Sequence, residues 1–172
     1  WTGAPIDSLR QSGYVVAGAG DSAVYRAPSL DMLASDLFAE DHCFRITSSP
    51  DSSHVGISFE PIADRRRIPE TAGTLWLHRT TSELRAADFH YVNVDRLIAT
   101  SGAGGSMQFI RMANGAWVIT RWSIRMPMME RNVTVSGASR MRSESRTVLT
   151  ALQEVGGELT LSWTAPGEDG GV

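Results

Sequence analysis

The residue types with the most chemical potential follow one another at positions 40–43, as Glu40, Asp41, His42 and Cys43. Carboxylates and an imidazole can hold a metal, and a thiol beside a histidine can form a nucleophile–base pair. Successive strand residues point to opposite faces, so a regular strand cannot bring His42 and Cys43 to one site. The pattern favours a helix-to-strand junction with solvated acids. Cys43, the only cysteine, is expected to be a buried inert thiol, with pairing to another chain as the alternative.

A second group of candidates lies on the two arms of one predicted hairpin. Asp88 stands in an apolar-looking strand and is expected to be a buried carboxylate, with Arg79 as its ion-pair partner. His78 and His90 fall at opposite ends of the hairpin, and no His-x-x-His spacing occurs, so a metal site is disfavoured. A hydrolase of unrecognised type would use Asp88, His90 or His42. A structural role is the simpler interpretation of each.

Composition disfavours several classes of function. The net charge of −3 has the wrong sign for neutralising nucleic-acid phosphates. All 16 basic residues are arginine, which leaves no lysine for Schiff-base chemistry, and the run 65–67 is expected to be a solvated loop. The glycine-rich segment 102–106 lacks the lysine of a phosphate-binding loop. No apolar run approaches the roughly 20 residues that span a bilayer. We therefore expect no cofactor, metal, nucleic acid or transmembrane segment.

The elements that position these residues are mostly strands. Residues 73–127 show two consecutive hairpins, with three of the five tryptophans among alternating apolar and polar residues. Turns are predicted at Thr81-Ser82 and at Asn114-Gly115. The pattern indicates a mainly β protein with one helix, of the α+β class. We expect a curved antiparallel sheet or open half-barrel of about 8–10 strands, with a single helix packed on one face.

One domain is predicted over residues 11–163, after a loose lead-in at 1–10 and before a flexible tail at 164–172. The helix is expected from Ser29, its N-cap, to Glu40, with an apolar stripe that includes Leu33 and Phe38. Pro127 is expected to end the strand 116–126, and Gly156-Gly157 to form a turn. Other strands are predicted over 13–17, 22–27, 42–47, 54–61, 147–155 and 158–163.

The Asn114-Gly115 turn predicts which residues share a face. A two-residue loop would place Phe109 opposite Thr120 and Met107 opposite Trp122. The more apolar face would then line the interior, and a carrier of hydrophobic ligands would use it as a cavity wall. The opposite face mixes tryptophan and arginine, as binding surfaces do. The expected cavity lining is Phe109, Trp122, Ile124 and Met126, and the expected binding surface is Trp76, Trp117, Arg121 and Arg125.

Two blocks, GTLWLHRTTSELRAADFHYVNV and AGGSMQFIRMANGAWVITRWSIRMP, resemble the C-terminal region of large exported bacterial proteins that carry a carboxypeptidase-regulatory-like β-sandwich upstream. DHCFRI and VGISFEP fit the same pattern, and the resemblance covers roughly residues 10–160. It implies an exported or envelope-associated chain with a structural or binding role. The alternation of long hairpins with one helix is similar to the lipoprotein-carrier architecture, at the level of fold.

Three hypotheses follow from these patterns. The first is a noncatalytic recognition or assembly module of an exported bacterial protein, which binds a protein partner or a second copy, with edge strands as a route to self-association. The second is a carrier of a lipid or other hydrophobic ligand in the cell envelope. The third is the hydrolase. The expected location is the periplasm, the periphery of the outer membrane or the extracellular space.

Overall fold

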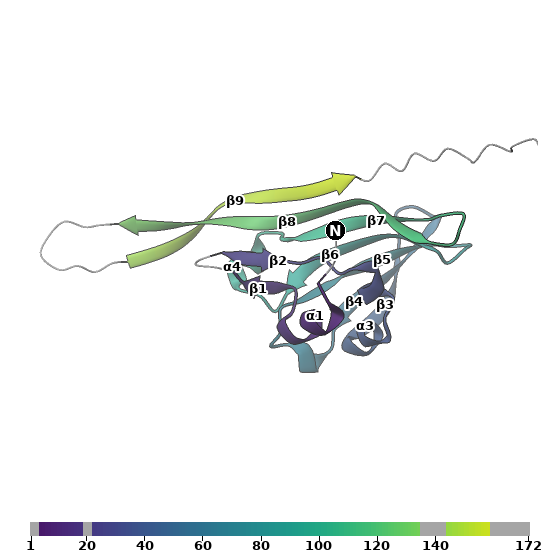
Figure 1. The fold of residues 1–172 in the computed structure, drawn as a ribbon, viewed down its shortest axis with the longest axis horizontal. Helices are drawn as coiled ribbons and strands as arrows, with labels where there is room; N and C mark the ends of the chain where they lie inside the picture. The colour runs from purple at the N-terminus through teal and green to yellow at the C-terminus, as the bar shows by residue number, and fades with distance from the viewer. Residues whose placement is uncertain (1–3, 19–21, 135–143, 159–172) are drawn as a thin grey trace, which may run out of the picture.

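The computed structural model of the chain describes residues 4–18, 22–134 and 144–158. Seven strands form one antiparallel sheet in which each strand pairs with the next along the chain, and β3 and β9 are its two edges (Figure 1). The predicted class, a mainly β protein with an open antiparallel sheet, is confirmed. The strands are β3 (His42–Ser48), β4 (His54–Pro61), β5 (Glu70–His78), β6 (Leu84–Val92), β7 (Gly104–Arg111), β8 (Trp117–Thr134) and β9 (Glu144–Glu158).

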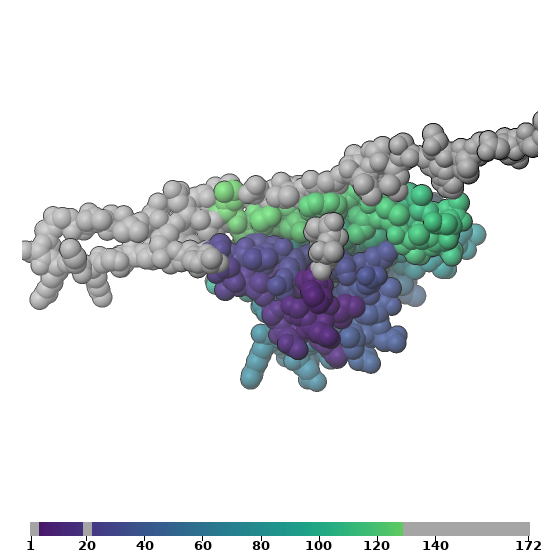
Figure 2. Space-filling model, viewed as in Figure 1, coloured from purple at the N-terminus to yellow at the C-terminus, as the bar shows by residue number. Residues whose placement is uncertain are grey.

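One face of the large sheet is covered by an N-terminal layer, the mass of purple and blue atoms in Figure 2. Leu9, Tyr14 and Phe38 of this layer are almost completely buried, and they belong to one core with Phe59 and Phe89 of the sheet. We call this side of the sheet the core face. The layer consists of α1 (Ile6–Ser12), β1 (Val15–Ala17), β2 (Ala23–Tyr25), α2 (Leu30–Leu33) and α3 (Asp36–Asp41), and two short helices, η1 (Ala63–Arg65) and α4 (Arg96–Thr100), lie in later connections.

The N-terminal layer differs from the prediction in two ways. The lead-in expected at 1–10 contains most of α1, and its Leu9 is fully buried. The single helix expected from Ser29 to Glu40 is two short helices that meet at Ser35. The Ser35 hydroxyl accepts a hydrogen bond from the Phe38 amide at 3.1 Å and donates one to the Met32 carbonyl at 2.7 Å. Because a serine can cap a new helix in this way, it divides an otherwise continuous apolar stripe.

The turn between β7 and β8 changes the predicted faces. Gly115 has a positive φ of 87°, and the Met112 amide donates to the Ala116 carbonyl at 2.7 Å, so three residues form the loop. Phe109 therefore pairs with Ile119, not with Thr120, and a register shift beyond that pair returns Met107 to Trp122 as predicted. The one-residue difference moves Trp117 to the core face, because side chains alternate along a strand.

The C-terminal strands are longer than predicted. Pro127 does not end β8, because the pairing of β7 with β8 stops at Arg125 and later residues of β8 need only β9 as a neighbour. Gly156 and Gly157 are not a turn, since they continue β9 opposite Ser123 and Trp122. The strand predicted over 158–163, apart from Glu158, and the tail at 164–172 lie outside the described residues.

Candidate functional site

The face of the large sheet that points away from the N-terminal layer is polar, and we call it the open face. Strand pairing sets its residues in rows that run across the strands. One row is Arg45, Ser58, Thr74, Asp88, Ser106 and Ser123. The row on one side is Ala72, His90, Gly104 and Arg125, with Glu60 next to it on β4. The row on the other side is Thr47, Gly56, Trp76, Ala86, Gln108 and Arg121.

A groove of about 550 Å³ lies on the open face, across β4 to β8. A smaller hollow of about 300 Å³ shares Glu60, Ala72 and His90 with it and reaches Arg66. The surface is depressed because the side chains at its centre are small and those around them are longer and polar. Neighbouring strands are only about 4.8 Å apart, so side chains on adjacent strands lie next to one another. The groove is lined by Ser58, Phe59, Glu60, Ala72, Gly73, Thr74, Asp88, Phe89, His90, Gly105, Ser106 and Arg125.

One side of the groove is held in place by a tryptophan–carboxylate contact. The indole Nε1 of Trp76 donates a hydrogen bond to Asp88 Oδ2 at 2.7 Å, from the neighbouring strand. Gly56 makes room for the indole, since a Cβ there would lie 2.8 Å from the Trp76 ring. Asp88 is exposed, not buried as predicted, and Arg79 is not its partner. The Arg79 guanidinium donates instead to the carbonyls of Ser52 and His54.

The remaining charged groups of the groove have no polar contact among the described side chains, and Arg125 pairs in register with Glu154 of β9. Glu60, His90 and Arg125 are exposed, and their side chains have no hydrogen bond or ion pair in the part of the chain that the structure describes. Glu60 was not singled out from the sequence, although it follows Phe59 in a regular alternation that would have placed it on the same face as the polar Ser58. The groove thus offers an acid, an imidazole and a guanidinium to an external ligand.

Several predicted site residues lie elsewhere. Trp117 packs against the core, on the other side of the sheet from Trp76, Arg121 and Arg125. His42 is buried on the core face, so it cannot act together with Asp88 and His90. The predicted cavity lining is packed by the chain's own side chains, with Phe109 2% and Ile124 7% exposed and Trp122 and Met126 packed against the same core. Cys43 is exposed, contrary to the buried thiol expected.

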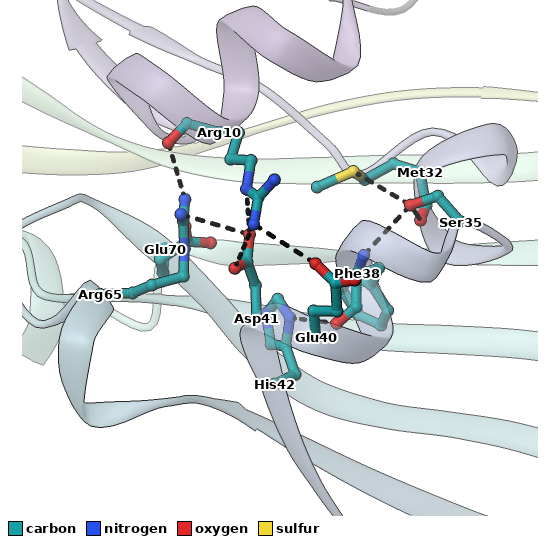
Figure 3. A network of polar contacts seen from close by, with 9 residues as sticks. All are labelled: Arg10, Met32, Ser35, Phe38, Glu40, Asp41, His42, Arg65 and Glu70. Carbon is teal, nitrogen blue, oxygen red and sulfur yellow. Dashed lines mark hydrogen bonds and ion pairs between the residues drawn. The ribbon is translucent and has the colours of Figure 1, made fainter.

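A second group of charged residues lies at the boundary between the N-terminal layer and the sheet (Figure 3). Arg10 of α1 donates from Nε to Asp41 Oδ2 at 3.0 Å, and Arg65 Nη1 lies 3.3 Å from the same oxygen. Arg65 also donates from Nε to Glu70 Oε1 at 2.6 Å and from Nη2 to the Arg10 carbonyl at 2.9 Å. We call Arg10, Asp41, Arg65 and Glu70 the buried ion-pair cluster. Arg65 is therefore buried and is not part of the solvated loop predicted at 65–67, whereas its neighbours Arg66 and Arg67 are exposed.

Burial shifts the pKa values around this cluster. The pKa of Glu70 is raised because its carboxylate is removed from water, although Arg65 opposes this effect. The pKa of His42 is lowered by its burial, which outweighs the opposing effect of the hydrogen bond between Nδ1 and the Phe38 carbonyl at 2.9 Å. Since a carbonyl can only accept, the proton of neutral His42 lies on Nδ1. These groups hold elements together, and none lines the groove.

No protein-family model matches the chain, and no curated protein or solved structure matches it. The resemblance to the C-terminal region of exported proteins with a carboxypeptidase-regulatory-like domain stays a prediction. Among the described residues, no three His, Cys, Asp or Glu side chains are grouped as metal ligands would be. Within the same residues, no helix combines the length and apolar character needed to cross a bilayer.

Proposed function

We propose that the chain is a noncatalytic recognition module of an exported bacterial protein, and that it binds a polar segment of a protein partner in the groove on its open face. The observation that carries the proposal is the set of exposed charges that have no partner among the described side chains, around a floor of small side chains. Glu60 and Arg125 belong to strands four positions apart in the sheet, so they lie roughly 19 Å from each other. An extended peptide of about six residues has a similar length.

The chemistry of the groove suits a ligand with both donors and acceptors. Arg125 can form paired hydrogen bonds with a carboxylate, and Glu60 can accept from a cationic group. Between them the hydroxyls of Thr74 and Ser106 and the free oxygen of Asp88 can bond a peptide backbone. All strands under the groove are already paired on both sides, so the ligand is recognised by side chains and not by strand addition.

The geometry supports recognition better than hydrolysis. Asp88 and His90 share the open face, but they are two residues apart on one strand and exposed, and Asp88 is bonded to Trp76. His42, the third catalytic candidate, lies on the other face. A catalytic site needs several groups converging on one reacting atom in a place that excludes water.

Peptide display tests this proposal. A random peptide library would be selected on the immobilised chain, and the enriched peptides would be measured against Arg125→Ala and Glu60→Ala. We expect charged, extended peptides whose affinity falls by roughly tenfold or more in either variant, because a charge-assisted hydrogen bond is lost. Arg67→Ala, which removes an exposed arginine outside the groove, is the matched control and should bind as the natural chain does. Enriched peptides that bind all four proteins equally would exclude the groove.

A further inference from the structure

The outer edge of β3 carries a row of backbone groups without a strand partner. In an antiparallel pair, residues that are hydrogen-bonded to the neighbouring strand alternate with residues that are not. The Ile62 amide donates to the Asp41 carbonyl at 3.0 Å, so the next residues bonded to β4 are Cys43, Arg45 and Thr47. The alternate residues must direct their N–H and C=O groups away from β4. These residues are His42, Phe44, Ile46 and Ser48. Among the strands that the structure describes, none lies on this side of β3.

The same edge exposes apolar side chains. Ile46 is 83% exposed and Phe44 is 40% exposed, and both lie on the core face beyond the cover of the N-terminal layer. Natural edge strands are usually protected by short length, bulges, proline or several charges. β3 has seven residues, pairs with β4 without a register shift and contains one charged residue, Arg45. An edge of this kind is open to pairing with another strand.

We infer that β3 pairs with β3 of a second copy of the chain, antiparallel and about a two-fold axis at Arg45, to form a dimer with one continuous sheet. This register pairs the exposed residues Phe44 and Ile46 of each copy, whereas His42 is only 4% exposed and its backbone is covered by the chain itself. The register places Phe44 of one copy opposite Ile46 of the other, an aromatic–β-branched pair of the kind that stabilises sheets. The patch is thus complementary to itself, as a two-fold interface requires.

This register places Arg45 of one copy opposite Arg45 of the other. The two like charges form the one unfavourable side-chain pair of the interface. Both guanidinium groups lie on the exposed open face, where water and salt weaken their repulsion. A shift of the axis to Phe44 or to Ile46 would separate the charges, but it would place Phe44 or Ile46 opposite its own copy and lose the pairing of Phe44 with Ile46. The register about Arg45 is the one that places Phe44 opposite Ile46 on both sides of the axis.

The dimer joins the open faces of the two copies on one side of the combined sheet, with Cys43 opposite Thr47 of the second copy. It does not depend on the groove, so Arg125→Ala should lose peptide binding and keep the dimer. In this way a failure of the dimer and a failure of the proposed function can be told apart.

Sedimentation velocity from micromolar to millimolar concentration tests the dimer under reducing conditions. We expect a concentration-dependent shift to twice the mass of one chain. Ile46→Lys should weaken dimerisation by at least tenfold, because it buries a charge at the interface. Ile110→Lys, at an exposed isoleucine on the inner strand β7, is the matched control and should leave the dimer unchanged. A chain that stays monomeric throughout, or an Ile46→Lys variant that dimerises as before, would overturn the inference.

Disulfide trapping tests the register. Thr47→Cys places a second thiol opposite Cys43 of the other copy, in a non-hydrogen-bonded pair with Cα atoms about 4.5 Å apart, which a disulfide can bridge. Oxidation should give a covalent dimer, while Ser48→Cys, one residue further and on the other face, should not. Arg45→Ser should tighten the dimer severalfold by removing the like charges. Trapping by Ser48→Cys instead of Thr47→Cys, or weaker association of Arg45→Ser, would reject the axis at Arg45.

Discussion

The molecule places the same residue types in two very different surroundings. The buried ion-pair cluster and the groove each contain arginines and carboxylates, and each has a histidine beside it. In the cluster, Glu70 is 1% exposed and Arg65 is 8% exposed, and every charge has a partner of opposite sign. In the groove the charges are exposed, and most have no partner among the described residues. Burial decides whether such groups hold the fold together or remain available for a ligand.

The comparison also separates the roles of the two sheet faces. In the buried ion-pair cluster every charge has a partner of opposite sign, because an unpaired charge away from water is strongly unfavourable, although Glu70 Oε2 and His42 Nε2 have no hydrogen-bond partner among the described residues. On the open face Glu60, His90 and Arg125 are exposed to solvent, which a ligand can replace. Substitutions in the two regions should therefore affect different measurements, stability in one and binding in the other.

The largest effect is expected from Arg65→Met. The substitution leaves Glu70 buried without its guanidinium partner and removes one of two partners of Asp41, so we expect a loss of about 3–5 kcal/mol in the free energy of unfolding. Urea denaturation followed by circular dichroism measures it. Arg67→Met should change stability by less than about 0.5 kcal/mol, as an exposed substitution does. If Arg65→Met were equally mild, the cluster would have no structural role. The double variant with Glu70→Met should recover part of the loss.

A smaller effect on the free energy of unfolding is expected from His42, because its contribution depends on the binding of a single proton. The pKa of His42 lies below its ordinary value of 6.5 in the folded chain. In the interval between the two values the unfolded chain binds a proton that the folded chain does not. The free energy of unfolding therefore falls as the pH decreases from about 7 through 6.5 towards the folded pKa. His42→Asn should remove this contribution, so the variant should lose less stability than the natural chain between pH values of about 7 and 5.

Urea midpoints measured across this pH range for the natural chain and His42→Asn test the sign. The raised pKa of Glu70 acts in the opposite direction, since its protonation favours the folded state as the pH falls, but it contributes equally to both proteins. His90→Asn, at the exposed histidine of the groove, is the control and should follow the natural chain. A His42→Asn curve parallel to that of the natural chain would contradict the effect of burial.

The smallest change in stability is expected in the groove. Arg125→Ala should alter the free energy of unfolding by less than about 0.5 kcal/mol, because the side chain is exposed and makes no ion pair within the described residues. Thermal unfolding measures this, alongside the peptide affinity described above. A large loss of stability would show that Arg125 has a structural partner, and it would weaken the contrast between the two regions.

Much of the sheet could be predicted from the sequence. The strand at 54–61 was predicted with both of its ends, and the β5–β6 hairpin with its turn at Thr81-Ser82, because alternation of apolar and polar residues is a local signal. The alternation also placed Arg121 and Arg125 on one mixed face, which the structure shows to be the open face that carries Trp76. The error at Trp117 came from the turn, since Asn114-Gly115 is compatible with loops of two or three residues and one residue reverses the faces.

Less of the candidate site could be predicted. Asp88 and His90 were singled out, but their exposure and the bond from Trp76 depend on a neighbouring strand and on Gly56 beyond it. Glu60 joins them only because β4 and β5 pair in one particular register. The ion-pair cluster was missed for a similar reason, since Arg65 looks like Arg66 and Arg67 in the sequence.

By itself, the sequence determined most of the segments that are strands, because side chains that alternate between two faces leave a period of two that needs no other part of the chain. The end of β8 and the course of β9 through Gly156 and Gly157 depended on pairing with a neighbouring strand. Only the tertiary structure decided which charged groups are paired. Arg10 and Asp41 are 31 residues apart, and Arg65 bonds the Arg10 carbonyl across 55 residues. Whether a charge is buried beside a partner or left in water depends on how the N-terminal layer covers the sheet. Packing between distant segments sets that arrangement, and no local pattern records it.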